Sequence, residues 1–231
     1  MCFSANASFG AGVILSVIGI ASIKKTEKKS QIYFACIPLL FCIQQVSEGF
    51  LWLALTHPGF GILQKPSTYF YLFFAQVVWP VLIPFAILKL EEEKKRKMML
   101  RILVGIGLLV SLYLAYCLLF YTSEAKITGY HIRYQQDYPI VFGGYGDFLY
   151  SLATIAPAVV SSIKRMWLLS ITILVSYLIT LLFYVDYIIS VWCFFAAIIS
   201  IMVLYLLNHI NKKVFPDHDE LHIYSLYKKI E

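Results

Sequence analysis

One apolar stretch of the sequence carries three side chains whose types and spacing suit chemistry. Gln44, Glu48 and Trp52 follow one another at intervals of four residues, so a helix through 31–55 places them on one face. An ionisable side chain within an apolar span is costly, and it therefore faces a bundle interior or a water-filled cavity. We expect Glu48 to be the centre of a site for a ligand, a proton or a substrate. A structural hydrogen-bond cluster that joins helices is the alternative.

Further polar and aromatic side chains fall in the outer halves of other apolar stretches and in the longest loop. Polar groups from several helices at one depth form the usual small-molecule pocket of a helix bundle. We therefore expect an outward-facing polar and aromatic cavity around Glu48. An aromatic belt at the membrane surface explains some Tyr and Trp residues, but not Gln44 or Gln76. The predicted ligand-binding residues are Gln44, Glu48, Trp52, Gln76, Trp79, Tyr116, Tyr134, Asp147, Tyr150 and Trp192.

Catalysis at the same site is an alternative to binding. In that case Glu48 acts as the acid or base on a lipid or amphipathic substrate, assisted by Cys2 or His131. Metal assistance would use Cys2, His57 and His131. These side chains carry suitable donor atoms but lack the spacing of a metal signature, so we predict no metal site. The sequence contains no motif that indicates a cofactor.

The composition requires these side chains to lie in a membrane protein. Of 231 residues, 60% are hydrophobic and only 14% are charged, whereas about 25% are charged in a typical soluble domain. This excludes a disordered chain, a disulfide mini-protein and an ordinary soluble enzyme. Seven apolar stretches are each long enough to cross a bilayer, and we predict an all-α bundle of seven transmembrane helices. Their predicted bounds are 8–23, 31–55, 68–90, 98–121, 145–163, 166–184 and 188–207.

The basic residues predict the orientation of the bundle. Lys and Arg concentrate in the cytoplasmic loops of membrane proteins. Of the 19 basic residues, all but Lys65, Lys126 and Arg133 fall in alternate loops or in the C-terminal tail. The N-terminus is then outside, residues 1–210 form the membrane domain, and 211–231 form a short cytoplasmic tail. Membrane position and anionic lipid account for the net charge of +6, so we expect lipid contacts and no nucleic-acid partner.

The beginning of the chain resembles a known family. Residues 1–9 read MCFSANASF and are similar to the start of an uncharacterised bacterial integral-membrane family with an MCFSA-type N-terminus. The segments 44–52 and 78–84 resemble the same family. The family has no assigned activity, so the resemblance implies a fold and the bacterial cytoplasmic membrane, but no mechanism. It also implies that one site contains Cys2, Ser4, Glu48, Trp52, Trp79 and Pro80.

Two functions of different classes fit these observations. The first is a receptor-like or sensor-like binding protein whose outward cavity holds a small molecule or a lipid. The second is an intramembrane enzyme that uses Glu48. Proton-coupled transport is a weaker option, because transporters normally contain paired repeats or interrupted helices and the sequence shows no convincing repeat. The sequence leaves the identity of the ligand and the oligomeric state open.

Overall fold

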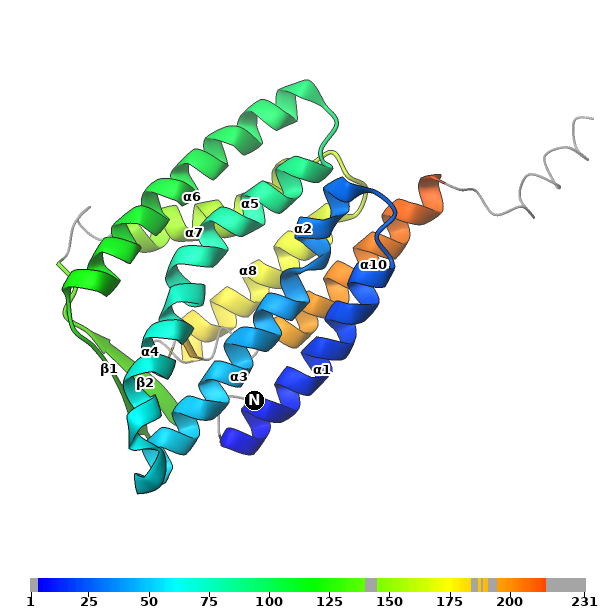
Figure 1. Cartoon of the computed structure of the whole chain (residues 1–231). Helices are drawn as coiled ribbons and strands as arrows, with labels where there is room; N and C mark the ends of the chain where they lie inside the picture. The colour runs from blue at the N-terminus through cyan, green and yellow to red at the C-terminus, as the bar shows by residue number, and fades with distance from the viewer. Residues whose placement is uncertain (1–3, 140–144, 184–186, 188, 191–194, 215–231) are drawn as a thin grey trace, which may run out of the picture.

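The apolar stretches of the sequence form helical segments long enough to cross a membrane. The computed structural model in Figure 1 describes residues 4–139, 145–183, 187, 189–190 and 195–214. Within these residues, five segments have the length and hydropathy of membrane spans, and two shorter helices are also apolar. The prediction of a largely helical, membrane-type fold is therefore confirmed. The five segments are Ala5–Lys24, Lys29–Thr56, Pro58–Leu90, Lys94–Phe120 and Met166–Phe183, and the shorter helices are Gly146–Val160 and Ala196–Asn211.

Two of these segments are built from several short elements. The second comprises η1 (Lys29–Gln31), α2 (Ile32–Ala35) and α3 (Ile37–Thr56), and the third comprises η2 (Pro58–Leu63), α4 (Gln64–Leu72), η3 (Phe73–Val78) and α5 (Trp79–Leu90). The other helices are α1 (Ala5–Lys24), α6 (Lys94–Phe120), α7 (Gly146–Val160), α8 (Met166–Phe183) and α10 (Ala196–Val214).

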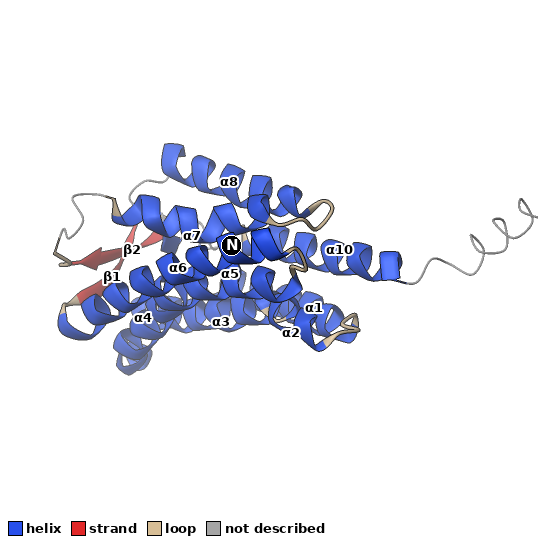
Figure 2. Ribbon diagram, turned by 90° about the horizontal axis from the view of Figure 1, so that it is seen from above, coloured by secondary structure: helices blue, strands red, loops and turns tan. Residues whose placement is uncertain are grey.

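The helices pack around one continuous hydrophobic core. Helix α1 packs on α3 and α10, α5 packs on α6 and α7, and α8 packs on α7 and α10. Figure 2 shows α7 and α8 on one side of the bundle and α1, α3 and α4 on the other. The shared core includes Leu15 of α1, Phe34 of α2, Trp79 of α5, Met166 of α8 and Leu206 of α10. Burial of this core fixes the faces that α3 and α5 turn inward.

The third segment changes its helical geometry just before two prolines. The six residues of η3 form a π-helix, and Pro80 follows in the first turn of α5. Proline lacks the N–H that would continue the helical hydrogen bonds, so nearby carbonyls need other donors. The Ala75 carbonyl accepts a bond from the Tyr150 hydroxyl at 2.5 Å, and the Val77 carbonyl accepts one from the Ser111 hydroxyl at 2.7 Å.

A β-hairpin lies between α6 and α7, a feature that the all-α prediction missed. Strands β1 (Ser123–Thr128) and β2 (His131–Gln136) pair antiparallel, with Ala125 opposite Tyr134. Gly129 begins the two-residue turn with φ 62°, as the first central residue of a type II′ turn requires. Alternate side chains, including Ala125 at 1% and Ile132 at 0% exposure, face the protein. The hairpin thus has a buried side despite its polar sequence.

The two ends of the bundle differ in charge. Figure 1 shows the start of α1 and the hairpin at one end, and the α5–α6 and α7–α8 connections with the end of α10 at the other. The second end carries the basic loops. Within the described residues, these loops and the helix ends beside them contribute Lys24, Lys25, Lys28, Lys29, Lys89, Lys94, Lys95, Arg96, Lys97, Arg101, Lys164 and Arg165.

Candidate functional site

The inward face of α3 buries the residues that the helical spacing singled out. Gln44 and Glu48 are 0% exposed, and Trp52 is 5% exposed. Helix α3 begins after Cys36 with Pro38 in its first turn, where a missing N–H costs little, and ends before His57. Three polar or aromatic side chains on one face are therefore removed from both lipid and water.

Two side chains in the described part of the chain donate hydrogen bonds to the Glu48 carboxylate. Its Oε1 accepts a hydrogen bond from the Ser190 hydroxyl at 2.7 Å, and its Oε2 accepts one from Gln45 Nε2 at 3.0 Å. Ser190 is 142 positions away along the chain, so packing of the bundle brings it to Glu48. No local pattern in the sequence points to Ser190.

Gln44 forms a hydrogen bond with Trp79 of α5. Its Oε1 accepts a hydrogen bond from Trp79 Nε1 at 2.8 Å, and the Trp79 ring stacks on Phe41 with centroids 4.0 Å apart. The structure thus brings Gln44 and Trp79 together and joins α3 to α5. This pair has the character of a helix-joining hydrogen bond within the membrane.

Two polar atoms near Glu48 are buried and have no hydrogen-bond partner in the described part of the chain. They are Gln45 Oε1, an acceptor, and Trp52 Nε1, a donor. Gln45, Glu48 and Trp52 are spaced by three and four residues, so they lie along one side of α3. Such orphaned groups are rare in proteins and need an explanation. Gln45 was not among the predicted site residues, although its three-residue spacing from Glu48 is visible in the sequence.

The hairpin covers the C-terminal end of this helix face. Ala125 and Ile132 of the hairpin form a buried cluster with Leu51 and Trp52, against which Tyr134 also packs. The position of Tyr134 on the hairpin therefore brings it to the Trp52 end of the site.

Tyr71 extends this cover and was not selected from the sequence. Its ring stacks on Tyr134 with centroids 5.1 Å apart and planes 5° from parallel. Its hydroxyl donates to the Ile189 carbonyl at 3.0 Å. Ile189 precedes Ser190, so Tyr71 links the hairpin to the segment that holds Glu48.

Gln76 anchors the hairpin to η3. Its Nε2 donates to Gln136 Oε1 at 2.9 Å, and its Oε1 accepts from the Tyr138 hydroxyl at 3.2 Å. Gln136 Nε2 donates to the same hydroxyl at 2.9 Å. Burial raises the pKa of Tyr138 to about 12, so this hydroxyl remains protonated at neutral pH. The predicted site residue Gln76 therefore positions the cover of the site.

Replacing Tyr138 by phenylalanine should loosen the hairpin. The change removes the hydroxyl shared by Gln76 and Gln136, and we expect a loss of about 1–3 kcal/mol in the free energy that holds the hairpin closed. Amide hydrogen exchange of Ser123–Gln136 should therefore accelerate. Tyr130→Phe is the matched control, because Tyr130 lies in the turn and is 79% exposed. Equal exchange in the two variants would contradict this anchoring role.

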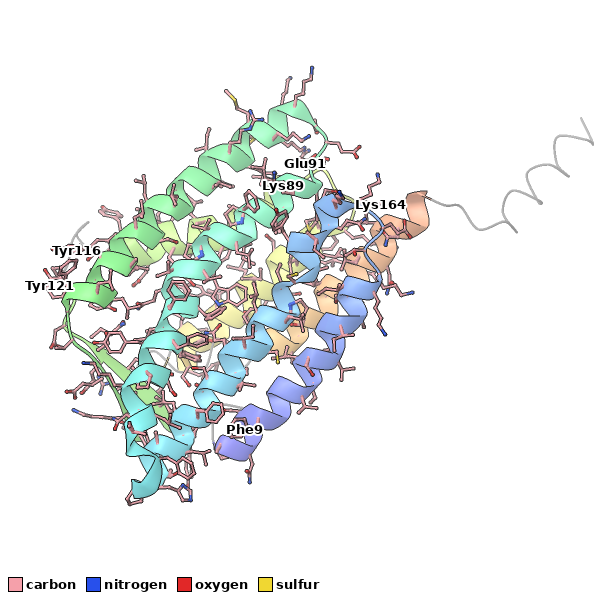
Figure 3. The ribbon with its side chains drawn as sticks, in the orientation of Figure 1. Phe9, Lys89, Glu91, Tyr116, Tyr121 and Lys164 are labelled. Carbon is pink, nitrogen blue, oxygen red and sulfur yellow. The ribbon has the colours of Figure 1, made fainter. Side chains whose placement is uncertain are left out.

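Other predicted site residues lie elsewhere. Tyr116 is 50% exposed and packs beside Phe120, with ring centroids 4.8 Å apart. Figure 3 shows Tyr116 and Tyr121 at the edge of the bundle, away from α3. Asp147 is exposed in the first turn of α7, and the Tyr150 hydroxyl donates to the Ala75 carbonyl.

Of the residues considered for catalysis or metal binding, His57 follows the end of α3 and His131 begins β2. His57 Nδ1 and the Thr56 hydroxyl form a hydrogen bond of 2.8 Å. The centroids of the His131 and Tyr187 rings are 4.8 Å apart. Burial lowers the pKa of His131. Cys2 and Trp192 lie outside the described residues. Within the described part of the chain, no three His, Cys, Asp or Glu side chains are grouped closely enough to hold a metal ion.

Comparison with known proteins agrees with the resemblance at the N-terminus. No curated protein and no solved structure matches the chain. A family of unknown function, DUF6629, matches residues 1–218, which include every helix described above. The chain therefore belongs to the DUF6629 family.

Proposed function

We propose that this protein is a receptor-like or sensor-like membrane binding protein whose outer half holds a small polar molecule or a lipid beside Glu48. The observation that carries the proposal is the pair of orphaned atoms, Gln45 Oε1 and Trp52 Nε1, on the helix face that buries Glu48. One accepts a hydrogen bond and the other donates one.

A bound molecule would give both atoms the partners they lack. Leaving a buried donor or acceptor unsatisfied costs about 1–3 kcal/mol, and the cost is greater where lipid excludes water. A ligand with a donor for Gln45 Oε1 and an acceptor for Trp52 Nε1 recovers this free energy on binding. Glu48 then supplies a third polar group, already oriented by Ser190 and Gln45. The hairpin, tied down through Gln76, covers the ligand.

The proposal includes a membrane orientation. We place seven spans across the bacterial cytoplasmic membrane, with the N-terminus and the hairpin outside and the C-terminus in the cytoplasm. Support comes from the basic loops, which lie at the end of the bundle opposite the hairpin. The site beneath the hairpin then faces outward.

Native mass spectrometry of the detergent-purified protein tests the binding role. We expect the wild type to retain an organic molecule as a discrete added mass. Trp52→Phe keeps an aromatic ring but removes the N–H, so occupancy should fall by up to about tenfold. Glu48→Gln should lower it as well. Glu124→Gln is the control, because Glu124 lies on the hairpin and its side chain is 64% exposed.

The same measurement separates binding from catalysis. An enzyme that uses Glu48 as acid or base would still bind its substrate after Glu48→Gln, because glutamine retains the shape and one acceptor oxygen. Undiminished or increased retention in Glu48→Gln would therefore contradict the binding role and favour the enzyme. A folded wild type without any retained molecule would contradict the proposal itself.

A further inference from the structure

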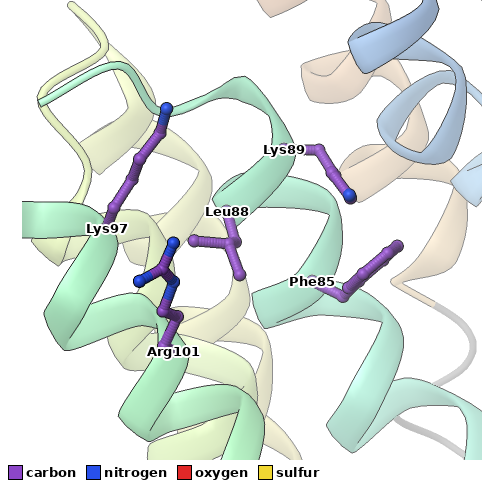
Figure 4. Close-up of a pocket in the computed structure, with 5 residues that line it drawn as sticks. All are labelled: Phe85, Leu88, Lys89, Lys97 and Arg101. Carbon is purple, nitrogen blue, oxygen red and sulfur yellow. The ribbon is translucent and has the colours of Figure 1, made fainter. Parts of the chain in front are cut away.

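A groove with three basic side chains lies between α5 and α6 at the lysine-rich end of the bundle. Its volume is about 310 Å³, and it is lined by Phe85, Leu88, Lys89, Lys97 and Arg101. Figure 4 shows Lys97 and Arg101 extending from α6 and Lys89 and Phe85 from α5, with Leu88 between them. Lys97 and Arg101 are four residues apart and therefore share a face of α6. The five lining residues include no acid, so the groove is strongly cationic.

Two of the three acidic residues that precede α6 have partners outside this groove. The Glu91 carboxylate accepts hydrogen bonds from Ser161 and Ser162, and Glu93 pairs with Arg96 at 2.9 Å. Within the described residues, the two salt bridges are Arg96–Glu93 and Lys126–Glu124, and neither uses a lining residue.

The side chains beside the groove suit contact with lipid. Lys89 Nζ lies 5.1 Å from the centroid of the Phe85 ring, which keeps its ammonium group next to the apolar part of the groove. Met98, Met99 and Ile102 of α6 are exposed by 63%, 52% and 60%. Cationic groups and exposed apolar side chains therefore meet at the end of a helix long enough to span a membrane. This arrangement is that of the boundary between head groups and acyl chains.

We propose that the groove binds the head group of an anionic phospholipid. Its phosphate would lie against Lys97 and Arg101 of α6, with the planar guanidinium of Arg101 able to donate two hydrogen bonds to it. Lys89 of α5, on the other side of Leu88, would add positive charge to the groove. An acyl chain would follow Leu88 and the exposed apolar side chains of α6. Basic pockets between membrane helices bind anionic lipids in this way. The site is separate from the Glu48 site and stands whether or not the binding role of Glu48 is correct.

The test compares two lipids on the full chain in mild detergent. Native mass spectrometry after equal exposure to phosphatidylglycerol and phosphatidylcholine should show preferential retention of phosphatidylglycerol. Lys89→Gln, Lys97→Gln and Arg101→Gln should each weaken that retention about fivefold, since each basic group near an anionic lipid contributes about 1 kcal/mol. Lys24→Gln, Lys25→Gln and Lys28→Gln are the matched controls, because these exposed lysines lie at the same end of the bundle.

Three outcomes would overturn the proposal. One is equal retention of the two lipids by the wild type. Another is undiminished retention of phosphatidylglycerol by the folded triple variant of Lys89, Lys97 and Arg101. The third is displacement of the lipid by inorganic phosphate at the same concentration, which would identify a site for free phosphate instead. The comparison of two lipids on the wild type needs no substitution, so a variant that fails to fold does not prevent the test.

Discussion

Gly107→Ala is expected to lower the free energy of unfolding by about 3 kcal/mol. Gly107 lies in α6 where that helix crosses α5, and a β-carbon at this position would lie 1.9 Å from the carbonyl oxygen of Pro80. The contact is with backbone, so the helices must separate to accept the methyl group. Pro84 has no N–H to donate to this carbonyl four residues earlier. The close approach of α6 therefore occurs at a carbonyl that lacks the usual helical hydrogen bond from residue 84.

Thermal unfolding in detergent, followed by circular dichroism, measures this effect. Gly105→Ala is the matched control on the same helix, since no atom lies within 4 Å of its added β-carbon. This control should be neutral, or stabilising by up to about 1 kcal/mol, because alanine favours helix more than glycine does. Equal stability of the two alanine variants would show that α5 and α6 are not in tight contact at Gly107.

The helices could be predicted from the sequence because a membrane allows few other backbone structures for a long apolar segment. Backbone groups in lipid must bond within their own segment, so long apolar runs become helices. The prediction began the first helix at 8, whereas α1 begins at Ala5, where the Ser4 hydroxyl accepts a bond from the Ala7 N–H at 3.2 Å. It missed Pro58–Ser67 because those residues are helical outside the apolar run. It also missed the hairpin. Its strands are short and mostly polar, so the alternation of buried and exposed side chains is weak in the sequence.

Only those residues of the candidate site that lie together on one helix could be predicted from the sequence. The spacing of Gln44, Glu48 and Trp52 identified the buried face of α3, because helical periodicity is a local property. Ser190 and Tyr71 depend on how distant segments pack, and no local pattern reports that. Tyr116, by contrast, was predicted for the site but lies half-exposed on α6, away from α3. In a helix surrounded by lipid, outward-facing and inward-facing tyrosines look alike in the sequence, because aromatic residues also favour the membrane surface.

Glu91→Ala should be the most destabilising single change, with a loss of about 3–5 kcal/mol in the free energy of unfolding, because each buried donor left without an acceptor costs about 1–3 kcal/mol. The Glu91 side chain is 1% exposed although it lies in the connection between α5 and α6. Its Oε2 accepts bonds from the Ser162 N–H at 2.7 Å and the Ser161 hydroxyl at 3.0 Å. Its Oε1 accepts bonds from the Ser162 hydroxyl and from the N–H groups of Glu92 and Glu93. Alanine would leave these five donors without their acceptor.

Glu92→Ala is the matched control for this prediction. Glu92 is the next residue, and its side chain is exposed. Exposed substitutions of this kind usually change stability by less than about 0.5 kcal/mol. Thermal unfolding of the two variants in the same detergent gives the difference. A Glu91→Ala variant as stable as Glu92→Ala would mean that the α5–α6 and α7–α8 connections are not held together by this carboxylate.

The contribution of Glu91 should also depend on pH in a defined direction. Burial acts to raise the pKa of Glu91, but hydrogen bonds from Ser162, Glu93 and Ser161 outweigh burial, and the pKa lies below its ordinary value. The unfolded chain, with a glutamate pKa of about 4.3, therefore takes up the proton first as the pH falls. The stabilisation is complete above that pH and is lost as the pH falls through the lower pKa of the folded state. The stability difference between the wild type and Glu91→Ala should thus stay constant from neutral pH to about pH 5.5 and narrow below about pH 4. A difference that widened in acid would mean that the folded protein prefers Glu91 protonated, and that the five donors do not determine its charge.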